Sequence, residues 1–249
     1  MVSLSNQDVL KWDVDNWSVA LAYWQRYGKL EGAPLECLEI GANQGGLSVW
    51  LASKGHRVVC SDLERTDASA RPLVTRYGVL DRVTFEDINA TAIPYENHFD
   101  VIVFKSVLGG VGHNRAIERQ RAAIASMHRA LKPGGEAQVV VPFCHPYHAY
   151  PADYSRFSRE QLQALFSDFR DVKIGIRTGP TTTMLTFVTY YLKLILPVHG
   201  GNRLRRAANR LLVGAAGWMM FPLKYLDAWM NHLPDAHVLA NHLYVSARK

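Results

Sequence analysis

The chain has 249 residues, of which 48% are hydrophobic and 20% charged. This length suffices for one large domain or two small ones, with a core that needs neither disulfides nor metals. The composition excludes collagen-like, low-complexity and wholly disordered proteins. The three cysteines, Cys37, Cys60 and Cys144, form neither a disulfide framework nor a zinc ribbon, and the amino terminus lacks a signal-peptide core. We therefore expect a cytoplasmic protein with free thiols.

The net charge of +6 lies in the carboxyl-terminal part of the chain. Up to Arg177 there are 20 basic and 20 acidic residues, whereas the residues from Thr178 onward include eight basic and two acidic ones. Six of these bases precede the first acid, Asp227. They are Lys193, Arg203, Arg205, Arg206, Arg210 and Lys224. This segment is either a solvated helix face or a surface for anionic lipid or another acidic partner.

Apolar runs alternate with helical patterns along most of the chain. The predicted strands are residues 35–40, 57–61, 83–85, 100–104, 137–141, 171–177 and 243–247. The predicted helices are residues 17–27, 47–54, 68–77 and 114–131, and a further helix that runs from a capping box at Ser158 and Gln161 to Phe166. Such alternation predicts right-handed βαβ units. The expected fold class is therefore α/β, with a doubly wound, Rossmann-like, mostly parallel sheet of seven strands.

We expect a single domain over residues 1–249. Residues 1–33 form an amino-terminal helical cap, whose aromatic residues either cover a cofactor or belong to the core. Residues 34–177 form a cofactor-binding core, and residues 242–249 form the last strand. Residues 178–241 are too many for a plain loop and carry helical apolar runs, so they are expected to be a helical insertion.

A glycine-rich turn at residues 41–46 follows the first predicted strand and opens a helix, which is the context of a nucleotide-binding turn. Glycine is needed where φ is positive or where a ligand presses against the backbone. Asp62 stands 21 residues after Gly41, at the end of the second strand, where a carboxylate can accept both hydroxyls of a ribose. The alternative is a tight turn beside a solvent-facing carboxylate.

Two ligands fit this turn: a dinucleotide such as NAD, and S-adenosylmethionine. The dinucleotide fingerprint needs a glycine at the position of Asn43, whose side chain would crowd a pyrophosphate. S-adenosylmethionine has no phosphate, and its cationic amino end suits Glu39, directly or through water. The residues therefore favour S-adenosylmethionine.

With these features the chain resembles the class I S-adenosylmethionine-dependent methyltransferases over about residues 35–177. The matching stretches, in order, are residues 38–46, 60–63, 85–88 with 93–94, 99–102 and 130–135. The resemblance implies an antiparallel last strand and adenine contacts from the side chain of Asp87 and the amide of Ile88. The implied cofactor-binding residues are Glu39, Gly41, Asn43, Gly45, Asp62, Leu63, Asp87, Ile88 and Lys105.

The chain departs from the family pattern in two places. Asn43 replaces the usual second glycine. Lys105 and Ser106 stand where nucleic-acid and protein amide methylases carry an Asn- or Asp-Pro-Pro-aromatic signature, so no nucleic-acid partner is expected. A narrower resemblance, at residues 145–147, 151–158, 222–227 and 247–249, is to bacterial methyltransferases of the methyltransferase-11 group. Many of these accompany polysaccharide and glycolipid biosynthesis enzymes, which implies a sugar or lipid-linked glycan acceptor.

Transfer of a methyl group to a hydroxyl needs alignment, exclusion of water and a base. The residues expected near the methyl group are Lys105, His113, His145, His148, Asp153 and Tyr154. His145 and His148 are the preferred bases, because imidazole changes its charge near neutral pH, and Asp153 is the third catalytic candidate. Each histidine is alternatively a hydrogen-bonded loop residue, and Asp153 and Tyr154 are alternatively structural. No metal site is expected.

The segments 184–198 and 211–223 are apolar but shorter than the ~20 residues that span a bilayer. They suit a helix lying in a membrane interface, a helical cap on the core, or a dimer surface. We predict O-methylation of a sugar or lipid-linked glycan precursor, with peripheral contact between residues 193–224 and the anionic inner face of a membrane. The alternatives are a small-molecule methyltransferase of another class, an NAD(P)-dependent oxidoreductase and a non-catalytic scaffold. The sequence does not determine the oligomeric state.

Overall fold

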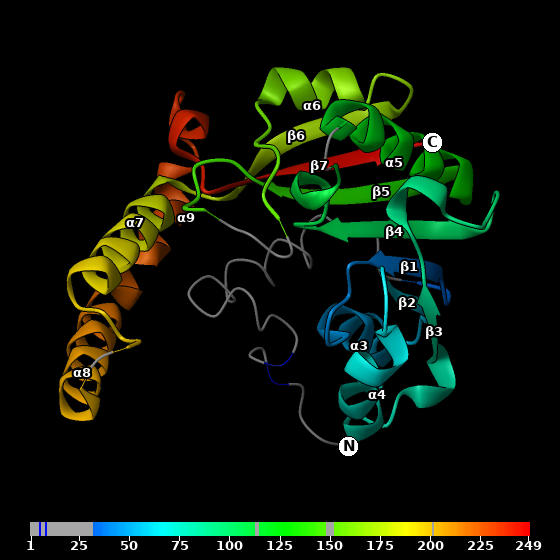
Figure 1. The fold of residues 1–249 in the computed structure, drawn as a ribbon. Helices are drawn as coiled ribbons and strands as arrows, with labels where there is room; N and C mark the ends of the chain where they lie inside the picture. Colours follow the sequence, from blue (N-terminus) through cyan, green and yellow to red (C-terminus); the bar gives the residue numbers. More distant parts are fainter. Residues whose placement is uncertain (1–4, 6–7, 9–31, 113–114, 148–151, 201) are drawn as a thin grey trace.

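The fold is taken from a computed structural model, which describes residues 5, 8, 32–112, 115–147, 152–200 and 202–249. These residues contain a seven-stranded sheet with the order β3-β2-β1-β4-β5-β7-β6 (Figure 1). The strands are β1 (Glu36–Ile40), β2 (Arg57–Asp62), β3 (Val83–Asp87), β4 (Phe99–Lys105), β5 (Leu131–Pro142), β6 (Arg170–Thr178) and β7 (His242–Arg248). β7 runs antiparallel to its neighbours β5 and β6, and the other pairs of neighbouring strands are parallel. This arrangement confirms the predicted fold class.

The sheet separates two apolar cores. Side chains alternate along each strand, so Leu38 of β1 and Leu243 of β7 belong to one core, whereas Cys37 and Tyr244 belong to the other. We call these sides the α5 face and the α3 face, after the helices that cover them (Figure 1). The helices are α3 (Gly46–Ser53), α4 (Thr66–Arg76), α5 (Ala116–Ala130) and α6 (Arg159–Leu165). The predicted helix 17–27 lies outside the described residues.

The start of β5 differs from the expectation. The Lys-Pro-Gly-Gly sequence at 132–135 was expected to precede the strand, but β5 already begins at Leu131. Its pairing with β4 shifts from Phe99–Leu131 to Val101–Glu136, so these four residues form an irregularity within the strand. A Cβ on Gly135 would lie 3.0 Å from the carbonyl oxygen of Phe99, which explains a glycine at this close approach.

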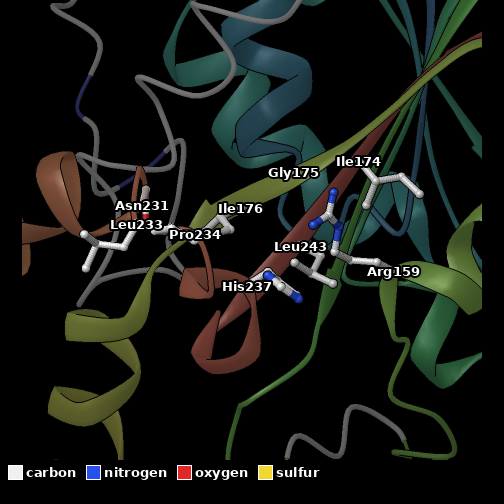
Figure 2. Close-up of a pocket in the computed structure, with 9 residues that line it drawn as sticks. All are labelled: Arg159, Ile174, Gly175, Ile176, Asn231, Leu233, Pro234, His237 and Leu243. Atoms are coloured by element: carbon white, nitrogen blue, oxygen red, sulfur yellow. The ribbon is translucent and has the colours of Figure 1, made fainter.

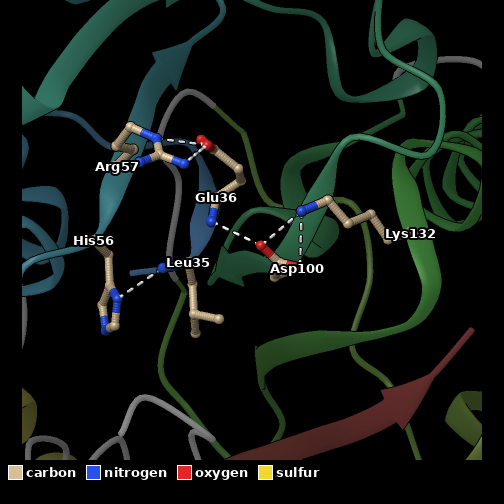
Figure 3. Close-up of polar contacts among 6 residues, drawn as sticks. All are labelled: Leu35, Glu36, His56, Arg57, Asp100 and Lys132. Atoms are coloured by element: carbon tan, nitrogen blue, oxygen red, sulfur yellow. Dashed lines mark hydrogen bonds and ion pairs between the residues drawn. The ribbon is translucent and has the colours of Figure 1, made fainter. Parts of the chain in front are cut away.

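Polar contacts tie the amino ends of β1, β2 and β4 together (Figure 3). The amide of Glu36 donates to Oδ2 of Asp100 at 2.9 Å, and Lys132 Nζ lies 2.9 Å from both oxygens of Asp100. The Glu36 side chain forms an ion pair with Arg57. These charges are engaged in joining strands at the edge opposite to the glycine turn, so we place no chemistry there.

The segment between β6 and β7 is helical, as predicted. It contains α7 (Pro180–Ile195), α8 (Arg203–Met220), two short 3-10 helices and α9 (Asp227–Met230). The buried carboxylate of Asp227 accepts the amides of Gly179, Thr181 and Thr182 at 3.1, 2.7 and 3.0 Å. It thereby satisfies the free N–H groups at the start of α7. α7 and α8 extend side by side away from the sheet (Figure 1). In the described part of the chain, no helix combines the length and apolarity needed to cross a membrane.

Candidate functional site

The glycine turn links β1 to α3 through three residues with positive φ. Gly41, Asn43 and Gly45 have φ values of 75°, 51° and 72°. A Cβ on Gly41 would lie 2.3 Å from Cγ2 of Val107, so glycine is required there by close packing against the segment after β4. Asparagine is among the non-glycine residues that tolerate this region best, so Asn43 can adopt a left-handed conformation at a position where the family usually has glycine.

Asp62 is fixed at the end of β2 by backbone groups. Its Oδ2 accepts the amide of Asn43 at 2.9 Å, and its Oδ1 accepts the amide of Leu63 at 2.8 Å. A carboxylate has about four lone-pair positions, so both oxygens retain capacity for further donors. The Leu63 side chain beside it is 64% exposed. Asp62 therefore has lone pairs for further donors next to an exposed apolar side chain.

Glu39 is buried below the turn, with 3% of its surface exposed. Its Oε2 accepts the amide and the hydroxyl of Ser48 at 2.8 and 2.6 Å. Burial raises the pKa of Glu39 to about 7. The hydrogen bonds from Ser48 and the charge of Lys105 oppose this rise, whereas the charge of Asp62 adds to it. A cation that approached this carboxyl group would favour its charged form.

Asp87, at the end of β3, contacts the start of α4. Its Oδ1 accepts the amide of Thr66 at 2.9 Å, and its Oδ2 accepts the amide of Arg65 at 3.2 Å. The bonds from Thr66 lower the pKa of Asp87, and the bond from Arg65 adds to this effect. The carboxylate thus caps a helix in this structure, and its contact with adenine stays a prediction.

The backbone amide of Ile88 makes a hydrogen bond within the sheet, which was not expected. It donates to the carbonyl of Asp62 at 2.7 Å, so β2 already uses the group that was expected to reach the adenine ring. Asn89 follows at the same end of β3, where its Oδ1 accepts the amide and hydroxyl of Thr91 at 3.0 and 2.9 Å. We add Asn89 to the candidate set. Asn89 directly follows Asp87 and Ile88, the two expected adenine contacts, and it is the N-cap of the next 3-10 helix.

His145 follows β5 in a loop with a defined ring orientation. Its Nδ1 lies 2.8 Å from the carbonyl oxygen of Pro146. Because a carbonyl only accepts, Nδ1 carries the proton, and Nε2 is the basic nitrogen of the neutral ring. The His145 ring lies 5.3 Å from that of His242 and 6.3 Å from that of Tyr190 in α7, between ring centroids.

The rings of His145, His242 and Tyr190, which we call the ring cluster, lie on the α3 face together with the glycine turn. His242 alternates with Leu243 along β7 and so lies on the same face as Tyr244, and Glu39 shares that face with Cys37. Lys105, at the end of β4, also follows this alternation, and its charge acts on Glu39. The structure therefore brings Glu39, Lys105 and His145 to one side of the sheet. His242 and Tyr190 join the candidate site through these ring contacts, and no local sequence pattern indicates either of them.

Asp153 has a positioning role in the same loop. Its carboxylate forms an ion pair with Arg156, whose Nη2 lies 2.6 Å from Oδ2. The same Nη2 donates to the carbonyls of His145 and Pro146 at 3.4 and 3.2 Å. These contacts favour the structural alternative for Asp153.

His113 and His148 lie outside the described residues. Within the described ranges, no group of three or more His, Cys, Asp or Glu side chains is arranged to hold a metal ion.

A pocket of about 190 Å³ lies elsewhere, on the α5 face beside β6 (Figure 2). Figure 2 shows Arg159, His237 and Leu243 on one side of it and Asn231, Leu233 and Pro234 on the other. Ile174 and Leu243 belong to the α5-face core, whereas Glu39 lies on the opposite face. The pocket contains none of the predicted cofactor residues.

Residues 38–139 match the family model of a methyltransferase domain. Among curated proteins, the chain is similar to the ubiquinone/menaquinone biosynthesis C-methyltransferase UbiE of Shewanella baltica, with 29% identity over 134 residues. The identity is 30% for UbiE of Shewanella sp. (strain ANA-3). Each match covers 51% of this chain and 51% of the relative, so the chain spans about half the length of the curated relatives it matches.

Solved structures share the fold over nearly the whole chain. Phosphoethanolamine N-methyltransferase 2 of Haemonchus contortus, in complex with phosphomonomethylethanolamine and S-adenosylhomocysteine, has 18% identity and a TM-score of 0.61. The match covers 98% of this chain and 60% of that one. The [4+2]-cyclase SpnF has 17% identity and a TM-score of 0.59, covering 93% and 80%. A fold found in both a methyltransferase and a cyclase does not by itself determine the reaction.

Proposed function

The chain contains a class I S-adenosylmethionine-dependent methyltransferase domain, and on this basis we propose that it methylates a hydroxyl group of a sugar or lipid-linked glycan precursor. The observation that carries the proposal is the placement of Glu39 and Asp62 on either side of the glycine turn, on the face that also holds His145. S-adenosylmethionine is the cofactor, and when bound it supplies a methyl group on a positively charged sulfur.

The residues at the carboxyl edge of the sheet fit this cofactor. Glu39 would hold its amino group, because a carboxyl group with a pKa of about 7 is readily converted to the carboxylate by a nearby cation. Lys105 would hold the carboxylate of the same amino-acid end. Asp62 would accept the ribose hydroxyls through its remaining lone pairs, and Leu63 would offer apolar surface to the adenine.

The acceptor would lie on the same face, toward the ring cluster. Nε2 of His145 would take the proton from the acceptor hydroxyl, since Nδ1 is held by the carbonyl of Pro146. Arg156 donates to the carbonyls of His145 and Pro146, so it would position the base. His148 remains a proposed alternative base.

A lipid-linked acceptor would bring the protein to a membrane, and we include peripheral contact through residues 193–224 in the proposal. Five of the six bases of this segment lie at exposed or half-buried positions. Lys224 is an exception. It is buried, and its Nζ lies 3.5 Å from the centre of the Phe221 ring, so it is withdrawn from the predicted contact surface.

Two measurements test the proposal. Calorimetric titration with S-adenosylmethionine and with NAD should show binding of the first only. Formation of S-adenosylhomocysteine should then depend on an added sugar or lipid-linked sugar, which separates an enzyme from a scaffold. Binding of NAD, or binding of S-adenosylmethionine without turnover on any hydroxyl acceptor, would contradict it.

A second candidate reaction is methylation of a carbon atom of a small molecule. It is favoured by the similarity to UbiE, which is named as a C-methyltransferase. Nuclear magnetic resonance of the methylated product distinguishes the two reactions, because an O-methyl and a C-methyl group differ in carbon chemical shift.

A further inference from the structure

We propose that α8 docks this protein on the surface of an anionic phospholipid bilayer, through one apolar stripe along its exposed side. Leu204, Leu211 and Trp218 stand at intervals of seven residues and are 80%, 74% and 84% exposed. Leu212 and Met219 are exposed beside them. This inference builds on the proposed membrane contact and identifies the surface that makes it.

The stripe lies opposite to the side of α8 that packs on the rest of the insertion. Asn209 and Val213 are the buried residues of α8, and Nδ2 of Asn209 donates to the carbonyl of Pro197 at 2.9 Å. With 3.6 residues per turn, Leu211 and Trp218 point roughly away from that side. Large contiguous apolar surfaces are rare on monomeric soluble proteins and commonly mark interaction sites.

The positive charge in the first half of α8, which flanks the stripe and continues behind it, selects the partner. Arg203, Arg205, Arg206 and Arg210 all belong to the first half of α8, and the sequence has no Asp or Glu from Thr178 to Leu226. A second copy of this surface would therefore add like charges without an acid to pair them. Anionic headgroups supply the opposite charge, while the acyl region receives the apolar side chains.

The charges are concentrated at one end, so the helix is not uniform along its length. Its second half, from Leu211 to Met220, has no charged residue and contains the exposed Trp218. Burying arginine in hydrocarbon is costly, whereas tryptophan is favoured at the interface. The arginine end therefore stays among the headgroups, and the uncharged second half lies at the boundary between headgroups and acyl chains, with Trp218 at that boundary.

Co-sedimentation with vesicles of phosphatidylcholine, with and without phosphatidylglycerol, tests the docking without cofactor or acceptor. The intact chain should bind only the anionic vesicles, less strongly but still measurably at high salt. A stripe variant, Leu211→Ser with Trp218→Ser, and a charge variant, Arg203→Gln, Arg205→Gln and Arg206→Gln, should each bind at least about tenfold more weakly. Arg210 is kept, because its Nε donates to the carbonyl of Val198 at 3.2 Å.

Ile117→Ser is the matched control, because Ile117 is an exposed apolar residue on α5. It should bind vesicles like the unmodified protein. Quenching of tryptophan fluorescence by brominated lipid should also be smaller in Trp218→Phe than in the unmodified protein. All these positions except half-buried Arg206 are exposed, so thermal unfolding should show that the variants remain folded.

Three results would overturn the inference. If the unmodified protein ignores anionic vesicles at low salt, both the stripe and the proposed membrane contact fail. If the stripe variant binds as well as the unmodified protein, the contact is purely electrostatic and the stripe has another role. If sedimentation velocity shows a dimer that only the stripe variant dissociates, the stripe is an interface between two copies. None of these results bears on methyl transfer, which is measured separately with soluble acceptors.

Discussion

The backbone amide of Asn43 donates a hydrogen bond of 2.9 Å to Oδ2 of Asp62. This bond joins the middle of the glycine turn to the end of β2. The carboxylate proposed to bind the ribose therefore also holds the turn in its left-handed conformation. Substitutions at Asp62 are expected to affect both cofactor affinity and stability, and the two effects are separately measurable.

Asp62→Asn tests this double role. An asparagine offers one oxygen in place of two, so one of the amides of Asn43 and Leu63 loses its acceptor. Loss of charge-assisted bonds should lower the affinity for S-adenosylmethionine about ten- to a hundredfold, and the free energy of unfolding should fall by about 1–2 kcal/mol. Calorimetry and urea unfolding measure the two effects. Asp67→Asn, in an exposed ion pair with Arg71, is the control and should change neither. Unchanged affinity in Asp62→Asn removes Asp62 from the site.

Gly41→Ala compared with Gly78→Ala separates close packing from backbone strain. Both glycines have positive φ, 75° and 67°, but only Gly41 has a neighbour within 4 Å of an added Cβ. Gly78→Ala should cost about 1–2 kcal/mol from the left-handed conformation alone. Gly41→Ala should cost about 1–3 kcal/mol more, because Val107 has to move. Guanidinium unfolding measures the difference, and equal losses would show that the segment after β4 yields without cost.

Glu39 predicts a pH dependence of cofactor binding. Burial raises its pKa from 4.5 to about 7, so the free folded protein gives up this proton only near neutral pH. The contribution of the protonated group to stability is complete below pH 4.5 and is lost as the pH rises through 7. Conversely, affinity for a cationic amino group should rise between pH 6 and pH 8 as the carboxylate forms.

Glu39→Gln is the test of this titration. Its side-chain oxygen still accepts from Ser48, but the group no longer ionises. Affinity for S-adenosylmethionine should be lower and nearly independent of pH from 6 to 8, as measured by calorimetry. If the substituted protein keeps the pH dependence of the original, another group is responsible for it.

His145→Gln tests the proposed base. Turnover should fall by roughly 10²- to 10⁴-fold with cofactor affinity near normal, and the acidic limb of the pH–rate profile should disappear. His237→Gln, in the separate pocket on the α5 face, is the control and should keep normal rates. His148→Gln should be measured beside them. Normal rates in both the His145 and His148 variants would move the base elsewhere, with His113 next in line.

The glycine turn and Asp62 were predictable because their chemistry is local in sequence. A strand, a turn that needs positive φ and a carboxylate at the end of the next strand lie within 27 residues, from Glu36 to Asp62. The strands themselves were found for the same reason, since buried apolar runs of this length mark them directly. The end of the turn also fixed the start of α3.

The ring cluster was not predictable in this way. His145 meets His242 only because β5 pairs with β7, and it meets Tyr190 only because the insertion returns over the same edge. Nothing near His145 in sequence specifies either partner. The cap of α7 by Asp227 is also non-local, since this carboxylate stands 46 positions after Thr181, whose amide it accepts. Contacts of this kind depend on tertiary pairing, which local patterns do not encode.

Thr178 and His242 are register partners at the ends of β6 and β7, and the amide of Asn241 donates to the carbonyl of Thr178 at 2.8 Å. The chain therefore leaves the sheet and returns to it at one point. Because the two ends of this segment are neighbours, it forms a closed loop, and the conformational entropy lost on closing such a loop grows only slowly with its length. During evolution such a junction can accept a longer, shorter or unrelated segment without disturbing the strand register on either side. The sheet and the helical segment between β6 and β7 can thus diversify at different rates.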